Sequence, residues 1–269
     1  MNAGDIRPDL TAKLRLPDDG PVACKVCGGA TLALGVVDFN RSCEDARGLR
    51  LPRSGVPVQY RQCQDCALVF TDTFDDWAQA DFETHIYNAA YATVDPDYVA
   101  KRPDAMAQGV LGAFGAAKAD LDILDYGGGN GRFAELMGEA GVRCQTYDPF
   151  TPAFAARPAR RFNLVTCFET LEHMPDPAAG VGDIAGLVAD DGAVLFATLV
   201  QPAEFGAIGL GWWYVGPRNG HVTLYSRQAL ARLWGRFGFT VGSFNDNTHI
   251  AYRGAPPAFA RHLLGGVRK

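Results

Sequence analysis

The segment LDILDYGGGNGRFAELMGEAG, residues 121–141, constrains the fold of this chain more than any other part of the sequence. Its first six residues are typical of a short buried strand, and GGGNG allows a tight turn with close backbone approach. RFAELMGEAG then has the pattern of an amphipathic helix that ends at a glycine. A strand, a glycine turn and a helix in this order predict the nucleotide-binding end of a doubly wound α/β sheet.

The next predicted strand, VRCQTYD, ends at Asp148, where a carboxylate can accept hydrogen bonds from the two hydroxyls of a ribose. The ligand stays open at this point, because Gly129, Gly131 and Ala134 also fit the dinucleotide pattern G-x-G-x-x-A. Asp125 favours a different ligand. A carboxylate directly before the glycines would repel a pyrophosphate, but it suits the ammonium group of an amino acid.

Asp125 followed by Gly127, Gly129 and Gly131 resembles motif I of the class I S-adenosylmethionine (SAM) methyltransferases. FNLVTCFETLEHMPDP and VADDGAVLFATL resemble the fourth and fifth strands of that family, and HVTLYSRQALARLWGRFGFTV resembles its late helix. The resemblance covers about residues 85–252. It implies a Rossmann-like α/β fold, with a seven-stranded, mostly parallel sheet and an antiparallel last strand, and it implies SAM as the cofactor.

The resemblance also implies roles for individual residues. Asp125 would help to hold the amino group of SAM, and Asp148 would hold the ribose. Phe150, which follows the ribose acid, and Phe168, at the end of the strand NLVTCF, are further predicted cofactor contacts. The stretch between Asp148 and Phe162 is shorter than the helix and third strand usual in the family, so it predicts no adenine contact.

Two Cys-x-x-Cys pairs, CKVC and CQDC, precede this region. Four thiolates suit the closed tetrahedral site of structural zinc, and the β-like sequence between the pairs predicts a zinc ribbon with an inserted loop. This ribbon also resembles the zinc-binding N-terminal extension of some bacterial methyltransferases. The remaining cysteines, Cys43, Cys144 and Cys167, are predicted to be loop or core residues. The predicted zinc ligands are Cys24, Cys27, Cys63 and Cys66.

The segment ETLEH follows the strand NLVTCF, at the sheet edge where α/β proteins bind ligands. Glu169, Glu172 and His173 have the spacing E-x-x-E-H, which resembles the metal-binding positions of ubiquinone-biosynthesis O-methyltransferases and small-RNA 2′-O-methyltransferases. Mg²⁺ or Mn²⁺ is one interpretation, with His221 as a candidate second histidine. A second is a metal-free general base, His173 or His221, oriented by a glutamate. A third is a purely structural loop.

Aromatic residues mark a candidate acceptor pocket. Tyr87 and Tyr91 lie in a predicted helical segment that is either core or a lid. GWWYVG contributes Trp212, Trp213 and Tyr214 after the fifth strand, and these are either pocket walls or a hydrophobic plug.

The predicted organisation is a zinc ribbon over residues 18–73, a helical linker or lid over 74–118, a SAM-binding domain over 119–252 and a tail over 253–269. MNAGDIRPDL lacks the pattern of an export signal and no apolar run is long enough for a membrane span, so a cytoplasmic protein is expected. The formal net charge of −5 argues against nucleic acid as a partner. The dense basic cluster RPARR is read as a solvated loop, and a homodimer is left open.

These observations predict a SAM-dependent methyltransferase that acts on a hydroxyl of a small molecule, such as a sugar, a glycan precursor or a natural product. Three alternatives remain: a C- or N-methyltransferase of a nucleotide sugar or natural product, an RNA 2′-O-methyltransferase, and a SAM-binding adaptor without turnover. The sequence does not distinguish whether the ribbon touches substrate, shields the pocket or forms a dimer.

Overall fold

The computed structural model describes residues 13–266, which divide into two compact units. Unit 1 comprises the described residues of Met1–Pro96 together with Glu172–Pro177 and Leu199–Arg232. Unit 2 comprises Asp97–Leu171, Ala178–Thr198 and the described residues of Leu233–Lys269. The first twelve residues, on which the expectation about an export signal rests, and residues 267–269 of the predicted tail lie outside the described part of the chain.

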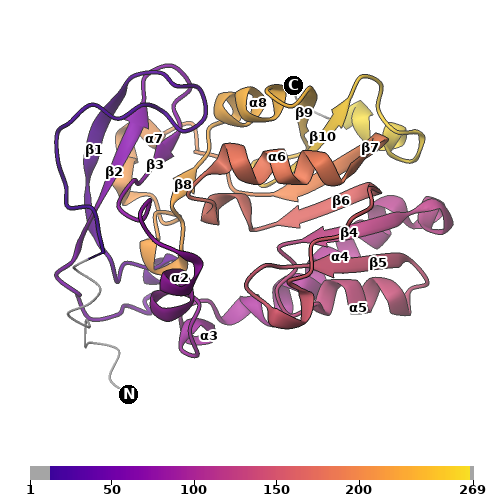
Figure 1. Cartoon of the computed structure of the whole chain (residues 1–269), viewed down its shortest axis with the longest axis horizontal. Helices are drawn as coiled ribbons and strands as arrows, with labels where there is room; N and C mark the ends of the chain where they lie inside the picture. Colours follow the sequence, from indigo (N-terminus) through magenta and orange to yellow (C-terminus); the bar gives the residue numbers. More distant parts are fainter. Residues whose placement is uncertain (1–12, 267–269) are drawn as a thin grey trace. The chain divides into compact units, whose positions relative to one another are not determined.

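Unit 2 is built on a six-stranded sheet with the order β5-β4-β6-β7-β10-β9 (Figure 1). The pairs β4–β5, β4–β6 and β6–β7 are parallel, whereas β10 is antiparallel to both β7 and β9. The Rossmann-like α/β fold and the antiparallel last strand are therefore confirmed. The strands are β4 (Asp122–Tyr126), β5 (Arg143–Tyr147), β6 (Phe162–Phe168), β7 (Val188–Ala197), β9 (Phe239–Ser243) and β10 (Thr248–Arg253).

The prediction of seven strands is wrong for the described residues, since this sheet has six. Residues 149–161 are too short for a crossover helix and a further strand, and they form only the 3₁₀ turn Pro152–Phe154. Strand β5 consequently ends the sheet on that side. The shortening that the sequence shows between Asp148 and Phe162 thus has a direct structural result.

Helices cover both faces of this sheet. Apolar side chains of α4 (Lys101–Phe114) and α5 (Arg132–Glu139) form one core with Ile123 of β4. Tyr126 points to the opposite face, because alternate residues of a strand face opposite ways, and its hydroxyl donates to Asp183 of α6 (Pro177–Leu187). The remaining helices of this part are α8 (Arg227–Gly235), which begins in unit 1, and the 3₁₀ segments Pro96–Tyr98, Gly115–Asp120, Leu171–His173 and Ala258–Gly266.

Unit 1 is built on a four-stranded antiparallel sheet with the order β1-β2-β3-β8. The last strand, β8, comes from a segment about 150 residues further along the chain than its neighbour β3, as the purple of β3 and the orange of β8 in Figure 1 show. The strands are β1 (Thr31–Asp38), β2 (Pro57–Cys63), β3 (Val69–Phe70) and β8 (Thr223–Leu224), and the helices are α2 (Gln79–His85), α3 (Tyr91–Val94), α7 (Phe205–Ile208) and the 3₁₀ segments Cys43–Arg47, Gly209–Gly211 and Pro217–Asn219.

The compact units differ from the predicted domain boundaries. The prediction assigned residues 119–252 to one continuous domain, but 172–177 and 199–232 belong to unit 1. The physical reason is the β3–β8 ladder, together with aromatic residues of 199–232 that join the core of unit 1. Among the described residues, no helix combines the length and hydropathy needed to cross a membrane.

Candidate functional site

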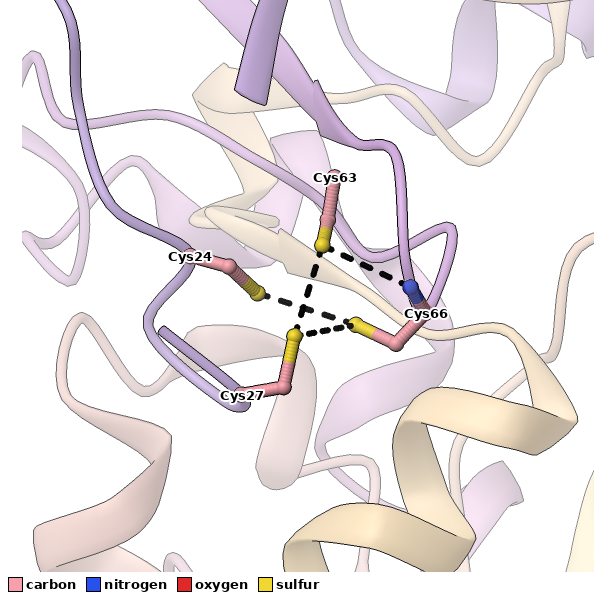
Figure 2. A group of neighbouring side chains, drawn as sticks. All are labelled: Cys24, Cys27, Cys63 and Cys66. Carbon is pink, nitrogen blue, oxygen red and sulfur yellow. Dashed lines mark hydrogen bonds between the residues drawn. The ribbon is translucent and has the colours of Figure 1, made fainter. Parts of the chain in front are cut away.

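Four cysteine sulfur atoms lie together in unit 1 (Figure 2). Cys27 Sγ is 3.4 Å from Cys63 Sγ and 3.6 Å from Cys66 Sγ. Cys24 Sγ is likewise 3.6 Å from Cys66 Sγ. Four sulfur atoms around one zinc ion, each at about 2.3 Å from the metal, would be about 3.8 Å apart. The geometry of the cluster therefore fits a closed tetrahedral site.

The two Cys-x-x-Cys turns have the same backbone conformation. The residue after the second cysteine is left-handed in both, with φ +72° at Gly28 and +55° at Ala67. The amide of Gly28 donates to the carbonyl of Cys24, and the amide of Ala67 donates to the carbonyl of Cys63. Two further amides of the second turn donate to Cys63 Sγ at 3.4 Å. Amide donors of this kind stabilise a thiolate, which is the form that binds a metal.

Glu172, His173 and His221 form a second group in unit 1, with one ligand atom of each within 4.8 Å of the others. The two imidazole centroids are 5.0 Å apart. Glu172 and His221 are buried, whereas His173 is half-buried. A carboxylate beside two imidazoles can bind a divalent ion or move a proton, so both chemical interpretations of ETLEH are compatible with this arrangement.

Backbone carbonyl groups orient both imidazoles. His173 Nδ1 lies 3.1 Å from the carbonyl oxygen of Gly220, and His221 Nδ1 lies 2.8 Å from that of Tyr214. A carbonyl oxygen can only accept a hydrogen bond, so each Nδ1 must carry the proton. Each Nε2 then keeps a lone pair when the ring is neutral. Histidines that bind metals are commonly held in this way.

Three side chains contact this group in a way that no pattern in the sequence indicated. The hydroxyl of Tyr214 donates to Glu172 Oε1 at 2.5 Å, and the hydroxyl of Tyr60 donates to the carbonyl of His221 at 2.7 Å. Cys43 Sγ lies 3.5 Å from His221 Nδ1. Tyr60 and Cys43 lie about 160 to 180 residues before His221 in the chain, so only the fold brings them together.

The predicted pocket aromatics separate into two classes. Tyr91, Trp212 and Tyr214 are buried in the core of unit 1, and the hydroxyl of Tyr91 donates to the carbonyl of Asn219. Tyr87 is half-buried, with its ring 6.0 Å from that of His173. Trp213 is 48% exposed. Of the predicted pocket aromatics, only Tyr87 and Trp213 thus present surface to a ligand. Of these two, Tyr87 is the one whose ring lies beside His173.

Glu169, the first glutamate of ETLEH, belongs to unit 2. Its backbone is left-handed, with φ +48°, a conformation that costs a non-glycine residue about 1 kcal/mol or more. The Glu169 amide donates to the carbonyl of Ala197 at 2.9 Å, which ties this turn to the end of β7. The part of Glu169 in a metal site stays a prediction.

The glycine turn of unit 2 follows β4 as expected. Gly127, Gly129 and Gly131 all have left-handed φ values, +72°, +56° and +81°, which explains the choice of glycine. The carboxylate of Asp148 closes the turn from the end of β5. Its Oδ2 accepts from the amide of Gly129 at 2.8 Å, and its Oδ1 accepts from the amide of Phe150 at 2.8 Å.

Asp125 lies beneath this turn and is buried. Its Oδ1 accepts from the hydroxyl of Thr166 at 3.0 Å, but Oδ2 has no hydrogen-bond partner in the described part of the chain. Burial is the main cause that raises the pKa of Asp125 to about 7, with a smaller contribution from the nearby charge of Asp148. Burial also raises the pKa of Asp148, against the effect of the amides that donate to it.

Each unit has a hollow in its surface. One of about 480 Å³ in unit 2 is lined by Gly131, Thr146 and Phe154, beside the glycine turn. The other, of about 530 Å³, lies in unit 1 between β1 and the loop before β2, and it contains none of the predicted site residues.

The two phenylalanines predicted to contact the cofactor differ in exposure. Phe150 is 39% exposed, whereas Phe168 packs on Phe133 with ring centroids 5.6 Å apart.

Alanine at Gly128 is expected to destabilise unit 2. A Cβ atom there would lie 2.2 Å from Asp125 Oδ2 and 2.8 Å from a methyl group of Thr146, and both side chains are buried. The overpacking should cost about 1–3 kcal/mol. Gly138→Ala is the matched control, because that site in α5 has open space and alanine favours a helix by about 1 kcal/mol. Urea unfolding measures both, and equal stability of the two variants would contradict the prediction.

The raised pKa of Asp125 predicts how stability changes with pH. In the folded state the carboxyl group of Asp125 binds a proton with a pKa of about 7, well above the ordinary value of 3.8 for an aspartate. The contribution of Asp125 to the free energy of unfolding is therefore fully present below about pH 4. It is lost as the pH rises towards 7, and the free energy of unfolding then falls by up to about 1.4 kcal/mol per pH unit. Asp125→Asn should flatten the decline of Tm between pH 5 and 8, while exposed Asp191→Asn should leave it unchanged. An unaltered decline in Asp125→Asn would count against a buried acid.

Comparison with known sequences identifies the family. Residues 98–243, more than half of the chain, match the model of a family described as "Methyltransferase domain". The ubiquinone biosynthesis O-methyltransferase of Aromatoleum aromaticum is 36% identical over 89 residues, which are 33% of this chain and 37% of that protein. The enzyme of the same name from Ralstonia nicotianae is 43% identical over 27% of this chain and 31% of its own length. The matched region spans only about a third of these relatives.

Solved structures give weaker likenesses. An O-methyltransferase family protein from Burkholderia thailandensis has a TM-score of 0.48 at 20% identity, covering 66% of this chain and 63% of that one. A magnesium protoporphyrin IX methyltransferase from Synechocystis has a TM-score of 0.43 at 14% identity, covering 57% and 83%. Both scores are too low to bear on activity or substrate. The family match over residues 98–243 is sufficient by itself, and the chain belongs to the methyltransferase-domain family.

Proposed function

We propose that this protein is a SAM-dependent O-methyltransferase that acts on a hydroxyl group of a small molecule. Family membership supports methyl transfer. The observation that favours oxygen as the acceptor is the group of Glu172, His173 and His221, because a hydroxyl proton must be weakened or removed before its oxygen can attack. The name of the partial relatives, ubiquinone biosynthesis O-methyltransferase, supports the same atom.

The residues of the glycine turn fit SAM. The unpaired Oδ2 of Asp125 is a buried acceptor, and an ammonium group or a bridging water would satisfy it. Asp148 uses one lone pair on each oxygen for a backbone amide, so a second pair on each remains for ribose hydroxyls. Exposed Phe150 and the hollow beside Phe154 offer apolar surface for the adenine. SAM supplies a methyl group on a sulfonium, which is an already activated electrophile.

A divalent ion on Glu172, His173 and His221 is the first of two proposed ways to activate the hydroxyl. The two imidazoles favour Mn²⁺ over Mg²⁺, because nitrogen donors suit transition metals better. A bound ion would lower the pKa of the acceptor hydroxyl and fix its oxygen.

The second way needs no metal. With Nδ1 donating to a carbonyl, Nε2 of His173 can accept the hydroxyl proton directly. Half-buried Tyr87 next to His173 would position the acceptor, and the remaining groups would exclude water. In either case much of the rate would come from holding the two reactants together.

The cysteine cluster is proposed to bind one structural zinc ion. Its four sulfur atoms fill a tetrahedral coordination sphere, which leaves no position for substrate. None of the four cysteines forms a disulfide.

RNA is not favoured as the acceptor. The three arginines of RPARR each pair with a carboxylate, Arg157 with Asp183, Arg160 with Asp122 and Arg161 with Asp190. Paired in this way, and with a net charge of −5, they offer little to a phosphate backbone. Transfer to carbon or nitrogen, and an adaptor without turnover, remain alternatives.

Titration calorimetry of SAM into the zinc-loaded protein tests the proposal. Asp148→Ala should weaken SAM binding about tenfold to a hundredfold, because two hydrogen bonds to a charged group are lost and the turn loses its tie to Gly129. Asp190→Ala, an exposed carboxylate at 92% side-chain exposure, is the control. Absence of SAM binding to the wild type would refute the proposed function. Binding without turnover on any panel of small hydroxyl compounds would favour the adaptor.

A further inference from the structure

The segment that carries His221 is held between two parts of unit 1. On one side it forms the β3–β8 ladder, and the amide of Thr71 donates to the carbonyl of Val222 at 2.9 Å. On the other side the amide of Val222 donates to the carbonyl of Glu172 at 2.9 Å, and the hydroxyl of Thr223 donates to the carbonyl of Met174. Hydrogen bonds therefore connect β3, through residues 222–224, to the backbone of Glu172 and Met174.

The second cysteine turn is bonded directly to this same segment. The side-chain amide of Gln201 donates to the carbonyl of Ala67 at 2.8 Å and to the carbonyl of Leu224 at 3.0 Å. The hydroxyl of Ser226 donates to the carbonyl of Cys66. Gln201 thus joins the turn that follows Cys66 to the last residue of β8.

Strands β3 and β8 contain two residues each, and so short a ladder has little stability of its own. Ala67 is also in a left-handed conformation that an L-residue with a side chain adopts only under constraint. A metal ion on the four sulfur atoms would supply that constraint, and the hydrogen bonds of Gln201 would transmit it to β8.

We infer that the four-cysteine turn pair is a positioning element for the Glu172–His173–His221 group, and that Gln201 is a residue that links them, alongside Ser226. Ordering of β8 through Gln201 sets where His221 and Glu172 stand relative to one another, and hence how tightly the group binds a divalent ion. This inference rests on the proposed function for its link to catalysis, but the ordering of β8 does not depend on it.

The test is Gln201→Met in the full-length, zinc-loaded chain, a change that keeps the side-chain volume and removes both hydrogen bonds. Mn²⁺ affinity, followed by the electron paramagnetic resonance of free Mn²⁺, should fall about tenfold, as expected when a group that supports metal ligands is lost. Zinc content and SAM affinity should stay at wild-type values. Gln64→Met is the matched control, because Gln64 lies in the same cysteine turn and its side-chain amide donates to the nearby carbonyl of Gln62.

Hydrogen exchange of the Val222 amide provides a readout that needs no divalent ion. Faster exchange of Val222 in Gln201→Met than in Gln64→Met, with unchanged exchange at Gly127 in unit 2, supports the inference. If the wild type binds no Mn²⁺ but Val222 exchange increases, the metal part of the proposed function fails and the positioning role stands. Unchanged Val222 exchange in Gln201→Met overturns the inference. If the wild type binds Mn²⁺, a Gln201→Met variant with the same Mn²⁺ affinity as the wild type overturns it too.

Discussion

Serine at Cys63 is expected to abolish zinc retention and to unfold unit 1. Cys63 Sγ accepts two backbone amides and lies 3.4 Å from Cys27 Sγ, so its replacement removes a ligand and disrupts the turn. Structural zinc contributes about 10–16 kcal/mol of binding free energy in small zinc domains, which exceeds the usual stability of a domain. The zinc content measured by elemental analysis should fall from one ion per chain to none, and thermal unfolding should begin at a much lower temperature.

Cys144→Ser is the matched control for this loss. Cys144 lies in β5 of unit 2, it is half-buried, and it is not part of the four-sulfur cluster. The control should retain zinc and should show a change in Tm of a few degrees at most. A Cys63→Ser protein with wild-type Tm and no zinc would show that the cluster does not stabilise the fold.

Local sequence patterns predicted the elements whose causes are local. The turn from β4 into α5 follows from glycines that adopt positive φ, and the end of α5 follows from Gly141, whose φ is +80°. The proximity of the four sulfur atoms follows from two Cys-x-x-Cys pairs that take the same turn. In these cases a residue type and a short spacing are enough, since the structure depends on few neighbours.

Features that depend on distant segments could not be predicted in the same way. Nothing in the local sequence shows that β3 pairs with β8, because two-residue strands have no measurable periodicity. The same long-range pairing brings Tyr60 to His221 and moves residues 199–232 into unit 1. Tyr214 was predicted as either a pocket wall or part of a hydrophobic plug, and neither prediction included its hydrogen bond to Glu172, a contact that only the folded chain defines.

Glutamine at Glu172 is expected to eliminate divalent-ion binding and most of the methyl transfer while preserving the fold. The substitution keeps the shape of a fully buried side chain, and the amide oxygen can still accept from the hydroxyl of Tyr214. It removes the negative charge that attracts the divalent cation. Mn²⁺ affinity should fall by more than the roughly tenfold to hundredfold loss that follows removal of a group supporting a ligand.

Tyr214→Phe separates the charge of Glu172 from its orientation. This variant keeps the carboxylate and loses only the hydroxyl that donates to it, so Mn²⁺ affinity should fall about tenfold to a hundredfold. Tyr126→Phe is the control, since it removes a hydroxyl that donates to the carboxylate of Asp183 in unit 2. Calorimetry with Mn²⁺ and turnover with and without the ion rank the variants. If Glu172→Gln loses turnover equally in both conditions, Glu172 orients a histidine base, and the metal-free mechanism replaces the metal-assisted one.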